Sequence, residues 1–377
     1  MANEMTHSGV FSDPGTIFAG DPLFPACALP PGSFRNGIVV RMPNHLGDTV
    51  MALPALRALR RLLPKHCALH AIAPAAFRPL FETIPELDGF LPLARPRRIW
   101  SREELRALRM LRPGVGVLFN RSFRDALMMR LGGVPLLCGP AGRGQSLFLK
   151  RVFRFPPLHP GGKPAIRHQA RRYFDLAQAL GGDGEAAMPV FDLDRIGGEL
   201  SPELLRLTAR GSGLLLLAAG AAYGPAKRWP PENFRRVALD WLEYGGSVAA
   251  VGSAAEASAG EACLAGLPPE NAVNLCGKTS LDTLMRLLRA ASAVVANDSG
   301  VMHLAAALGT PGVAVFGSTD PAATAPVSAK WRVVCAPPEC APCLHRECPR
   351  RTEGPACMAA VTSGAVIEEL RRIAAGL

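Results

Sequence analysis

Residues 293–309 read AVVANDSGVMHLAAALG and combine a short apolar stretch, a polar turn and an apolar helical pattern. A strand that runs through a glycine-containing turn into a helix leaves unpaired backbone N–H groups at the helix start. The helix dipole lies behind these groups and favours negative charge. The turn spans residues 297–300, and the helix is expected to begin near Val301. Ser299, Gly300 and Val301 are therefore candidates for binding a phosphate group.

Side chains in and after this turn could take part in the same chemistry. Asp298 or Ser299 could cap the helix, and such a cap is compatible with phosphate binding because other N–H groups stay available. His303 lies in the first helical turn and could donate a hydrogen bond to an anion, or it could pack in the core. These three side chains are too close in sequence to form a hydrolytic triad, whose members come from separate elements.

A second candidate lies in residues 221–230, AAYGPAKRWP, directly after an expected strand. In doubly wound sheets, the loops at the carboxyl ends of the strands bind ligands. Lys227 supplies a compact positive charge suited to a diphosphate. Taken alone, this segment could equally be a solvated basic loop. Its place before a helix, opposite the turn at residues 297–300, favours a diphosphate site formed by both segments.

Two carboxylates complete the candidate chemistry. Asp48 follows Gly47 at the start of a long expected helix. It could be a favourable charge at a helix N-terminus, or a general base that deprotonates a hydroxyl group. Glu256 lies shortly after an expected strand, where a nucleotide-binding carboxylate would contact ribose hydroxyls.

Four of the ten cysteines lie near the C-terminus with the spacing C-x2-C-x4-C-x8-C: Cys340, Cys343, Cys348 and Cys357. Four thiolates this close together could hold Zn²⁺ tetrahedrally. The spacing is irregular for a zinc ribbon, so a disulfide staple and free thiols stay open as alternatives. No other metal and no cofactor is expected.

The elements that must position these residues follow from hydrophobic periodicity. Apolar stretches typical of buried strands alternate with helical segments in both halves of the chain, which predicts an α/β protein with two Rossmann-like, doubly wound domains facing across a cleft. Strands are expected at residues 37–41, 67–73, 89–93, 115–120, 213–219, 247–251, 272–275, 293–296 and 312–316, and helices at residues 49–63, 101–111, 167–180, 231–244, 254–264, 281–291 and 363–375.

Composition divides the chain into five parts. Residues 1–36 are expected to be a flexible leader, residues 37–182 the N-terminal domain and residues 183–212 a linker. Residues 213–362 form the expected nucleotide-binding domain, with a cysteine-rich loop at 335–357, and residues 363–377 form a final helix. Residues 139–163 are rich in Gly, Pro and basic residues and predict a long mobile loop over the cleft.

The whole-chain composition limits the class of protein. The 377 residues suffice for two domains, and 49% hydrophobic with 19% charged residues is ordinary for a globular protein. A net charge of +11 favours acidic partners, but only 6% aromatic residues and scattered basic residues argue against nucleic acid. No apolar run approaches the ~20 residues of a membrane span, and the N-terminus lacks a signal-peptide pattern. A cytoplasmic location is expected.

Several segments closely resemble the ADP-heptose:lipopolysaccharide heptosyltransferases, in particular the heptosyltransferase II branch: MPNHLGDTVMALPALRAL, GPAKRWPPENF, NLCGKTSLDTLMRLLRAASAVVANDSGVMHLAAALGTP and the cysteine-bearing tail. The resemblance begins at Gly37 and leaves the leader without a role. It implies a GT-B fold and an inverting transfer of L-glycero-D-manno-heptose from ADP-heptose to the first heptose of the lipopolysaccharide inner core. No DxD-type metal motif is evident, so protein cations are expected to stabilise the leaving group.

The same resemblance implies roles for individual residues. Asp48 matches the family's proposed catalytic base, and Lys227 matches its diphosphate-binding lysine. Asp298, Gly300 and His303 match its donor-binding turn. The base and the donor-binding residues fall in different domains, so domain closure is expected to bring the acceptor to the donor.

The resemblance also places Glu256 near the family's ribose-binding acid and implies the partners. These are ADP-heptose, a lipid-linked lipopolysaccharide core acceptor and the cytoplasmic face of the inner membrane, contacted peripherally. Transfer to Kdo or to a later heptose stays open, as does a non-enzymatic binder of anionic lipopolysaccharide. A nicotinamide-dependent oxidoreductase is disfavoured because neither glycine-containing turn supplies G-x-G-x-x-G.

Overall fold

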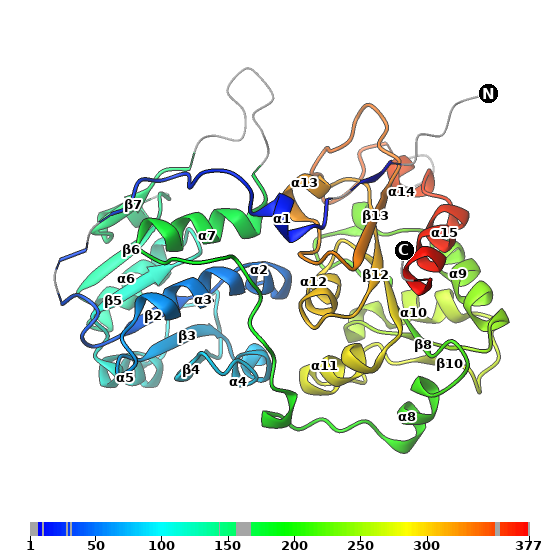
Figure 1. The fold of residues 1–377 in the computed structure, drawn as a ribbon, viewed down its shortest axis with the longest axis horizontal. Helices are drawn as coiled ribbons and strands as arrows, with labels where there is room; N and C mark the ends of the chain where they lie inside the picture. The colour runs from blue at the N-terminus through cyan, green and yellow to red at the C-terminus, as the bar shows by residue number, and fades with distance from the viewer. Residues whose placement is uncertain are drawn as a thin grey trace. The chain divides into compact units, whose positions relative to one another are not determined.

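The chain folds into two compact units, each built around one sheet (Figure 1). The structure is a computed structural model that describes residues 7–9, 11–27, 29–30, 32–142, 144–155, 167–350 and 355–375. One unit comprises residues 18–196, and the other comprises residues 1–17 together with 197–377. We call them the N-terminal and the C-terminal unit.

The N-terminal unit contains a parallel sheet of six strands in the order β4-β3-β2-β5-β6-β7. Its strands are β2 (Ile38–Arg41), β3 (Leu69–Pro74), β4 (Gly89–Leu93), β5 (Val115–Leu118), β6 (Leu136–Pro140) and β7 (Arg151–Phe153). β2 and β5 are buried along their whole length, as expected for central strands covered on both faces.

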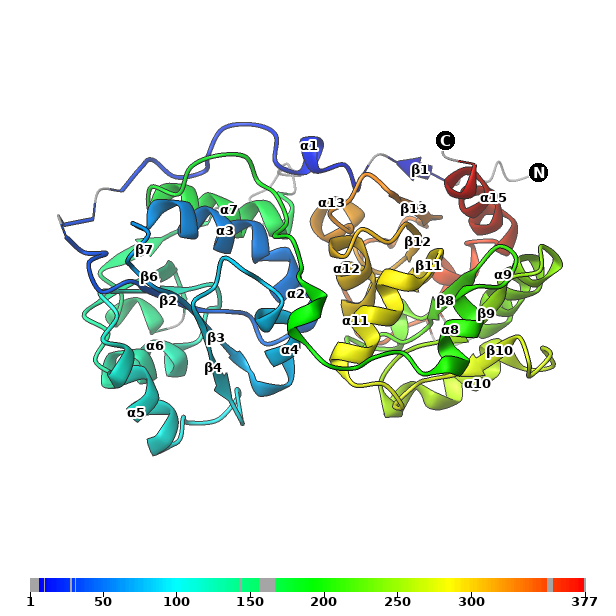
Figure 2. The same cartoon turned by 60° about the horizontal axis from the view of Figure 1, so that its bottom comes forward.

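Helices cover both faces of this sheet. They are α2 (Leu46–Met51), α3 (Leu53–Leu62), α4 (Arg78–Glu82), α5 (Arg102–Leu111), α6 (Phe123–Leu131) and α7 (Gln169–Ala179). Figure 2 shows α5 and α6 on one face and α3 and α7 on the other. The predicted capping box at Ser101 and Glu104 is present at the start of α5.

The C-terminal unit contains seven strands in the order β1-β13-β12-β11-β8-β9-β10. These are β1 (His7–Gly9), β8 (Leu214–Ala218), β9 (Ser247–Ala250), β10 (Ala272–Asn274), β11 (Ala293–Asn297), β12 (Gly312–Phe316) and β13 (Trp331–Cys335). Six of the strands run parallel, and β1 pairs antiparallel with β13. β8, β11 and β12 are wholly buried.

The helices of this unit also form two layers. They are α1 (Pro14–Ile17), α8 (Pro202–Thr208), α9 (Pro231–Glu243), α10 (Ala257–Leu264), α11 (Leu281–Ala290), α12 (Gly300–Ala307), α13 (Pro321–Thr324), α14 (Ala356–Ala359) and α15 (Ser363–Ala374). In Figure 1, α11 and α12 cover one side of the strands, and α9 and α15 cover the other. Within the described residues, no helix is both long and apolar enough to cross a membrane.

The leader differs from the loose extension that its composition predicts. Residues 7–9 form β1, which pairs through backbone hydrogen bonds with β13. Pairing of this kind cannot be recognised from the periodicity of the local sequence. Further along, Phe18 packs edge-to-face on Phe174, and Arg171 donates hydrogen bonds to the carbonyls of Phe18 and Gly20. The described part of the leader is therefore bonded to both units.

Three other segments differ from the sequence expectations. The helix expected at residues 49–63 is two helices joined at Ala52, because Pro54 at the start of α3 cannot donate the hydrogen bond that would continue α2. Residues 139–142 and 144–155 contain the end of β6 and all of β7 rather than a structureless loop, while residues 143 and 156–163 lie outside the described part. The expected linker contains α8.

Candidate functional site

The carboxyl ends of β8 and β11 are neighbours in the C-terminal sheet, and Asn297 joins the turns that follow them. Its Nδ2 donates to the carbonyl of Ala219 at 2.7 Å, and its Oδ1 accepts from the N–H of Trp229 at 3.1 Å. Trp229 is buried, and its indole Nε1 donates to the carbonyl of Val361. These bonds fix the segment before Trp229 beside the turn after β11.

Lys227 and Asp298 meet at this edge, as the sequence predicts for a site formed by both segments. The Lys227 Nζ lies 2.6 Å from Asp298 Oδ2, and the two side chains are 12% and 6% exposed. The same carboxylate oxygen accepts from Thr319 Oγ1 at 2.8 Å and, more weakly, from Thr324 Oγ1 at 3.5 Å. Asp298 therefore holds the lysine in a defined position at the mouth of the two turns.

The helix that follows begins as the sequence predicts. Ser299 is the N-cap of α12, and its side chain accepts a hydrogen bond from the N–H of Met302 at 3.5 Å. Of the two cap candidates, the structure therefore selects Ser299, while Asp298 binds Lys227. His303 is buried, with Nε2 4.0 Å from Asp298 Oδ1. His303 is therefore both packed in the core and close to the carboxylate of Asp298.

Glu256 lies against the turn after β8, which also carries Lys227, and against the turn after β9. Its Oε2 accepts hydrogen bonds from the N–H and Oγ of Ser253, completing a capping box. A Cβ added to Gly220 would lie 1.9 Å from Glu256 Oε1, and one added to Gly252 would lie 2.8 Å from Oε2. The carboxylate thus occupies space that these two glycines leave beside the turn after β8.

No disulfide joins the four cysteines of the C-terminal tail. All ten cysteines are free thiols. Among the described residues, no group of three or more His, Cys, Asp or Glu side chains is arranged to hold a metal ion. Burial raises the pKa of the Cys357 thiol to about 11, and the neighbouring Cys343, Cys340 and Cys348 add to this rise.

Asp48 lies in the N-terminal unit, as the third residue of α2. The turn before α2 is held by Arg41, which ends β2 and is fully buried. The Arg41 guanidinium pairs with buried Asp125 at 3.1 Å and donates to Asn44 Oδ1 at 2.5 Å. Because this network is enclosed, the position of the α2 start is set by the core of the unit.

A small cationic cavity that sequence reasoning missed lies on the same unit. It has a volume of about 240 Å³, and its lining includes Arg121, which follows β5, and Gln169, Arg172 and Tyr173 of α7. Burial and the Asp48 charge raise the pKa of Tyr173, which places Asp48 within electrostatic reach of the cavity. Burial and Arg121 lower the pKa of Arg172. The only sequence signal was a set of scattered arginines.

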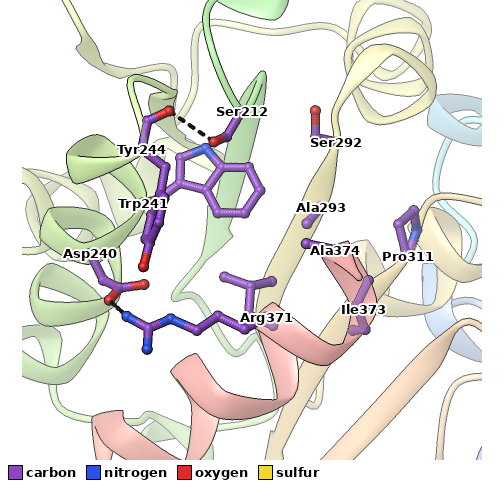
Figure 3. Close-up of a pocket in the computed structure, with 11 residues that line it drawn as sticks. Ser212, Asp240, Trp241, Tyr244, Ser292, Ala293, Pro311, Arg371, Ile373 and Ala374 are labelled. Atoms are coloured by element: carbon purple, nitrogen blue, oxygen red, sulfur yellow. Dashed lines mark hydrogen bonds and ion pairs between the residues drawn. The ribbon is translucent and has the colours of Figure 1, made fainter. Parts of the chain in front are cut away.

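A larger cavity, of about 560 Å³, lies at the other end of the C-terminal sheet (Figure 3). Ser212, Ser292 and Pro311, which precede β8, β11 and β12, line it at the amino ends of these strands. Its charged groups, Asp240 and Arg371, form an ion pair with each other. The cavity therefore lies away from the Lys227 site and offers no unpaired charge among its described lining residues.

Comparison with known proteins identifies the family of the chain. Residues 117–352 match glycosyltransferase family 9 (heptosyltransferase). The chain is 32% identical to lipopolysaccharide heptosyltransferase 2 of Escherichia coli over 79% of this chain and 87% of that protein. It is 39% identical to lipopolysaccharide heptosyltransferase 1 of Pseudomonas aeruginosa over 81% of this chain and 85% of that protein.

A solved structure of Escherichia coli ADP-heptose lipopolysaccharide heptosyltransferase II superimposes with a TM-score of 0.71 at 28% identity, covering 90% of this chain and 98% of that one. Both units therefore have the Rossmann-like α/β architecture of the GT-B fold. The chain belongs to glycosyltransferase family 9, the heptosyltransferase family, and is a glycosyltransferase.

Proposed function

We propose that this chain transfers L-glycero-D-manno-heptose from ADP-heptose to the first heptose of the lipopolysaccharide inner core, with inversion at the anomeric carbon. The observation that carries the proposal is the ion pair of Lys227 with Asp298, the residue directly before the N-cap of α12. A lysine ammonium and a helix N-terminus together suit a diphosphate. The similarity to enzymes named heptosyltransferase 2 supports the choice of sugar and acceptor.

In the proposed reaction, Asp48 accepts the proton of an acceptor hydroxyl while the hydroxyl oxygen attacks the anomeric carbon of the heptose. The bond between that carbon and the β-phosphate oxygen breaks, and ADP leaves with the electron pair. Lys227 and the backbone N–H groups of Gly300 and Val301 stabilise the charge that develops on the diphosphate. Attack from the side opposite the leaving group inverts the configuration.

The remaining residues of the C-terminal site are assigned to the donor. We place the diphosphate near Lys227, Ser299 and His303, with Asp298 contacting the donor sugar or its nucleotide. Glu256 is assigned to the ribose hydroxyls, because its carboxylate borders the turn after β8. No step in this scheme uses a metal or an organic cofactor.

The cationic cavity beside Asp48 is proposed to take an anionic group of the acceptor, a carboxylate or a phosphate. Arg121 and Arg172 both line it, and their like charges disfavour each other until an anion is bound. Arg172 also stacks over the ring of Phe155 at 4.5 Å, which orients its guanidinium group. An acceptor anchored there would present a hydroxyl to Asp48.

The 39% identity to a heptosyltransferase 1 supports a second candidate acceptor. That reading has the chain adding heptose to Kdo. Mass spectrometry of core oligosaccharide from a strain lacking this gene separates the two readings. A core that stops after its first heptose is the expected result, whereas a core without heptose would assign the Kdo-directed reaction.

The lipid-linked acceptor implies contact with the cytoplasmic face of the inner membrane, and we propose that α5 and α6 make it. Between residues 95 and 131 the chain carries ten arginines and three acidic residues. Ile99 and Met110 are each 74% exposed, and Leu131 is 51% exposed. Exposed apolar side chains among arginines suit the surface of an anionic bilayer.

Two sets of hydrogen bonds hold these helices in one layer. Arg124, near the start of α6, donates to the carbonyls of Pro96 and Arg97 before α5. Arg109, near the end of α5, donates to the carbonyl of Leu131 at the end of α6. The arginines and the apolar side chains therefore belong to a fixed surface, which we call the α5–α6 face.

Vesicle sedimentation tests this assignment. The unaltered chain should bind vesicles of 30% phosphatidylglycerol in phosphatidylcholine, and the double variant Arg102→Glu, Arg106→Glu should bind them at least ~10-fold more weakly. The matched control is Arg206→Glu, Arg210→Glu, which has the same spacing on exposed positions of the other unit. An equal loss of vesicle binding in both variants would mean that only net charge matters, and it would reject the α5–α6 face as the membrane contact.

A further inference from the structure

The cysteine-bearing segment of the tail is bonded directly to the loop that carries Lys227. The carbonyl of Arg346 accepts a hydrogen bond from the N–H of Ala226 at 3.1 Å. In the other direction, Arg346 Nε donates to the carbonyl of Tyr223 at 2.7 Å, and the Tyr223 hydroxyl donates to the carbonyl of Leu344 at 2.7 Å. Three hydrogen bonds thus join two segments more than a hundred residues apart.

Close backbone contact reinforces this junction. A Cβ added to Gly224 would lie 2.2 Å from the carbonyl oxygen of Arg346, so only glycine fits at this position. The N–H of Leu344 also donates to the carbonyl of Ser318 at 2.9 Å, next to Thr319, which binds Asp298. The segment is therefore packed against both loops that hold the Lys227 and Asp298 pair.

Two cations share the ring of Tyr223 at this junction. The Lys227 Nζ lies 4.7 Å from the ring centroid, and the Arg346 guanidinium carbon lies 5.6 Å from it. Two positive groups this close repel each other. Asp298 offsets the charge of Lys227, whereas Arg346 has no ion pair with a described acidic residue. The arrangement favours a ligand with more than one negative charge.

We infer that Arg346 is a second cation of the diphosphate site, positioned with Lys227 by Tyr223. This inference rests on the proposed function in taking the ligand to be a nucleoside diphosphate. The Nε of Arg346 is used by Tyr223, and its two terminal nitrogens have no hydrogen bond to the described residues. Those nitrogens form the planar fork that binds phosphate through two parallel hydrogen bonds.

Calorimetry with ADP and with adenosine tests this role. Arg346→Gln keeps a hydrogen-bond donor but removes the charge, and it should weaken ADP binding by ~10- to 100-fold. Adenosine, which has no phosphate, should bind as tightly as to the unaltered chain. Arg346→Lys should recover part of the loss, because it restores the charge without the fork. Arg350→Gln, a nearby exposed arginine, serves as the matched control and should change neither affinity.

Two results would overturn the inference. ADP binding of Arg346→Gln within twofold of the unaltered chain would exclude a role in phosphate binding. An equal loss of ADP and adenosine binding would reduce Arg346 to a structural support of the loop. Failure of the unaltered chain to bind ADP at all would instead reject the proposed donor, so the two ideas fail separately.

Discussion

One carboxylate oxygen of Asp298, Oδ2, contacts Lys227, Thr319 and Thr324. If Lys227 binds the donor as proposed, an ammonium group that is already held in place reduces the ordering that binding requires. The positive charge is thereby held next to Asp298, the residue before the N-cap of α12. Residue types alone identified Lys227 and Asp298 as candidates, but only the structure shows that they form an ion pair.

Replacing Lys227 by alanine should weaken ADP binding by ~10- to 100-fold, because a charge-assisted contact to the diphosphate is lost. Isothermal titration calorimetry measures this affinity directly. Lys330→Ala, an exposed lysine of the same unit, should leave it unchanged. An unaltered dissociation constant in the Lys227 variant would remove the lysine from the donor site.

Asp48→Asn removes the proposed base while keeping a side chain of the same size at the start of α2. We expect kcat to fall by ~100- to 10,000-fold, the range that general base catalysis supplies. ADP affinity should stay the same, because Asp48 and the donor site belong to different units. Turnover at the normal rate in this variant would assign the proton transfer to another group.

At the scale of elements, the strand–turn–helix connection recurs around every proposed group of the donor site. The turns after β8, β9 and β11 contribute Lys227, Glu256 and the start of α12. Parallel strands bring these turns to one edge whatever their distance along the chain. The cysteine-bearing segment is joined to the first of these turns by the hydrogen bond that the Arg346 carbonyl accepts from the N–H of Ala226.

Gly224→Ala tests that closure. The added methyl group would collide with the Arg346 carbonyl at 2.2 Å and push the segment away from the Lys227 loop. We expect a loss of about 1–3 kcal/mol in unfolding free energy, together with weaker ADP binding. Gly364→Ala is the control, since its nearest neighbouring atom would be 4.0 Å away. Normal ADP affinity in Gly224→Ala would show that the junction does not support the donor site.

Elements with strong local patterns could be predicted, and elements defined by pairing could not. The strands at Gly89–Leu93 and Gly312–Phe316 match their predicted bounds, because continuous apolar runs need no partner to be recognised. In contrast, β1 has the sequence HSG and exists through its bonds to β13. The junction at Arg346 joins distant segments through backbone carbonyls. Every residue has a backbone carbonyl, so the residue types could not predict this junction.

At the scale of the whole molecule, each unit has its own core and its own part of the proposed reaction. The buried pair of Arg41 and Asp125 fixes the N-terminal unit, and the Asn297 bonds fix the C-terminal one. The alternation of strands and helices predicted two such units. It could not predict that the described leader residues bond to both.

Asp125→Asn should therefore destabilise one unit selectively. Breaking a buried ion pair leaves Arg41 charged and unpaired, which costs about 3–5 kcal/mol. We expect thermal unfolding to show an earlier transition for the N-terminal unit, while ADP still raises the transition of the C-terminal unit. If both transitions of the variant shift to lower temperature by the same amount, and ADP raises neither, the two units do not unfold independently and the prediction is wrong.

The most direct test of the account is transfer by the purified chain. ADP-heptose is supplied with either of two acceptors, a core that ends in its first heptose or a core that contains Kdo and no heptose, and the products are weighed by mass spectrometry. We expect only the first acceptor to gain one heptose residue, and we expect Asp48→Asn to abolish the gain. Transfer to the heptose-free core alone, or to neither acceptor despite normal ADP binding, would contradict it.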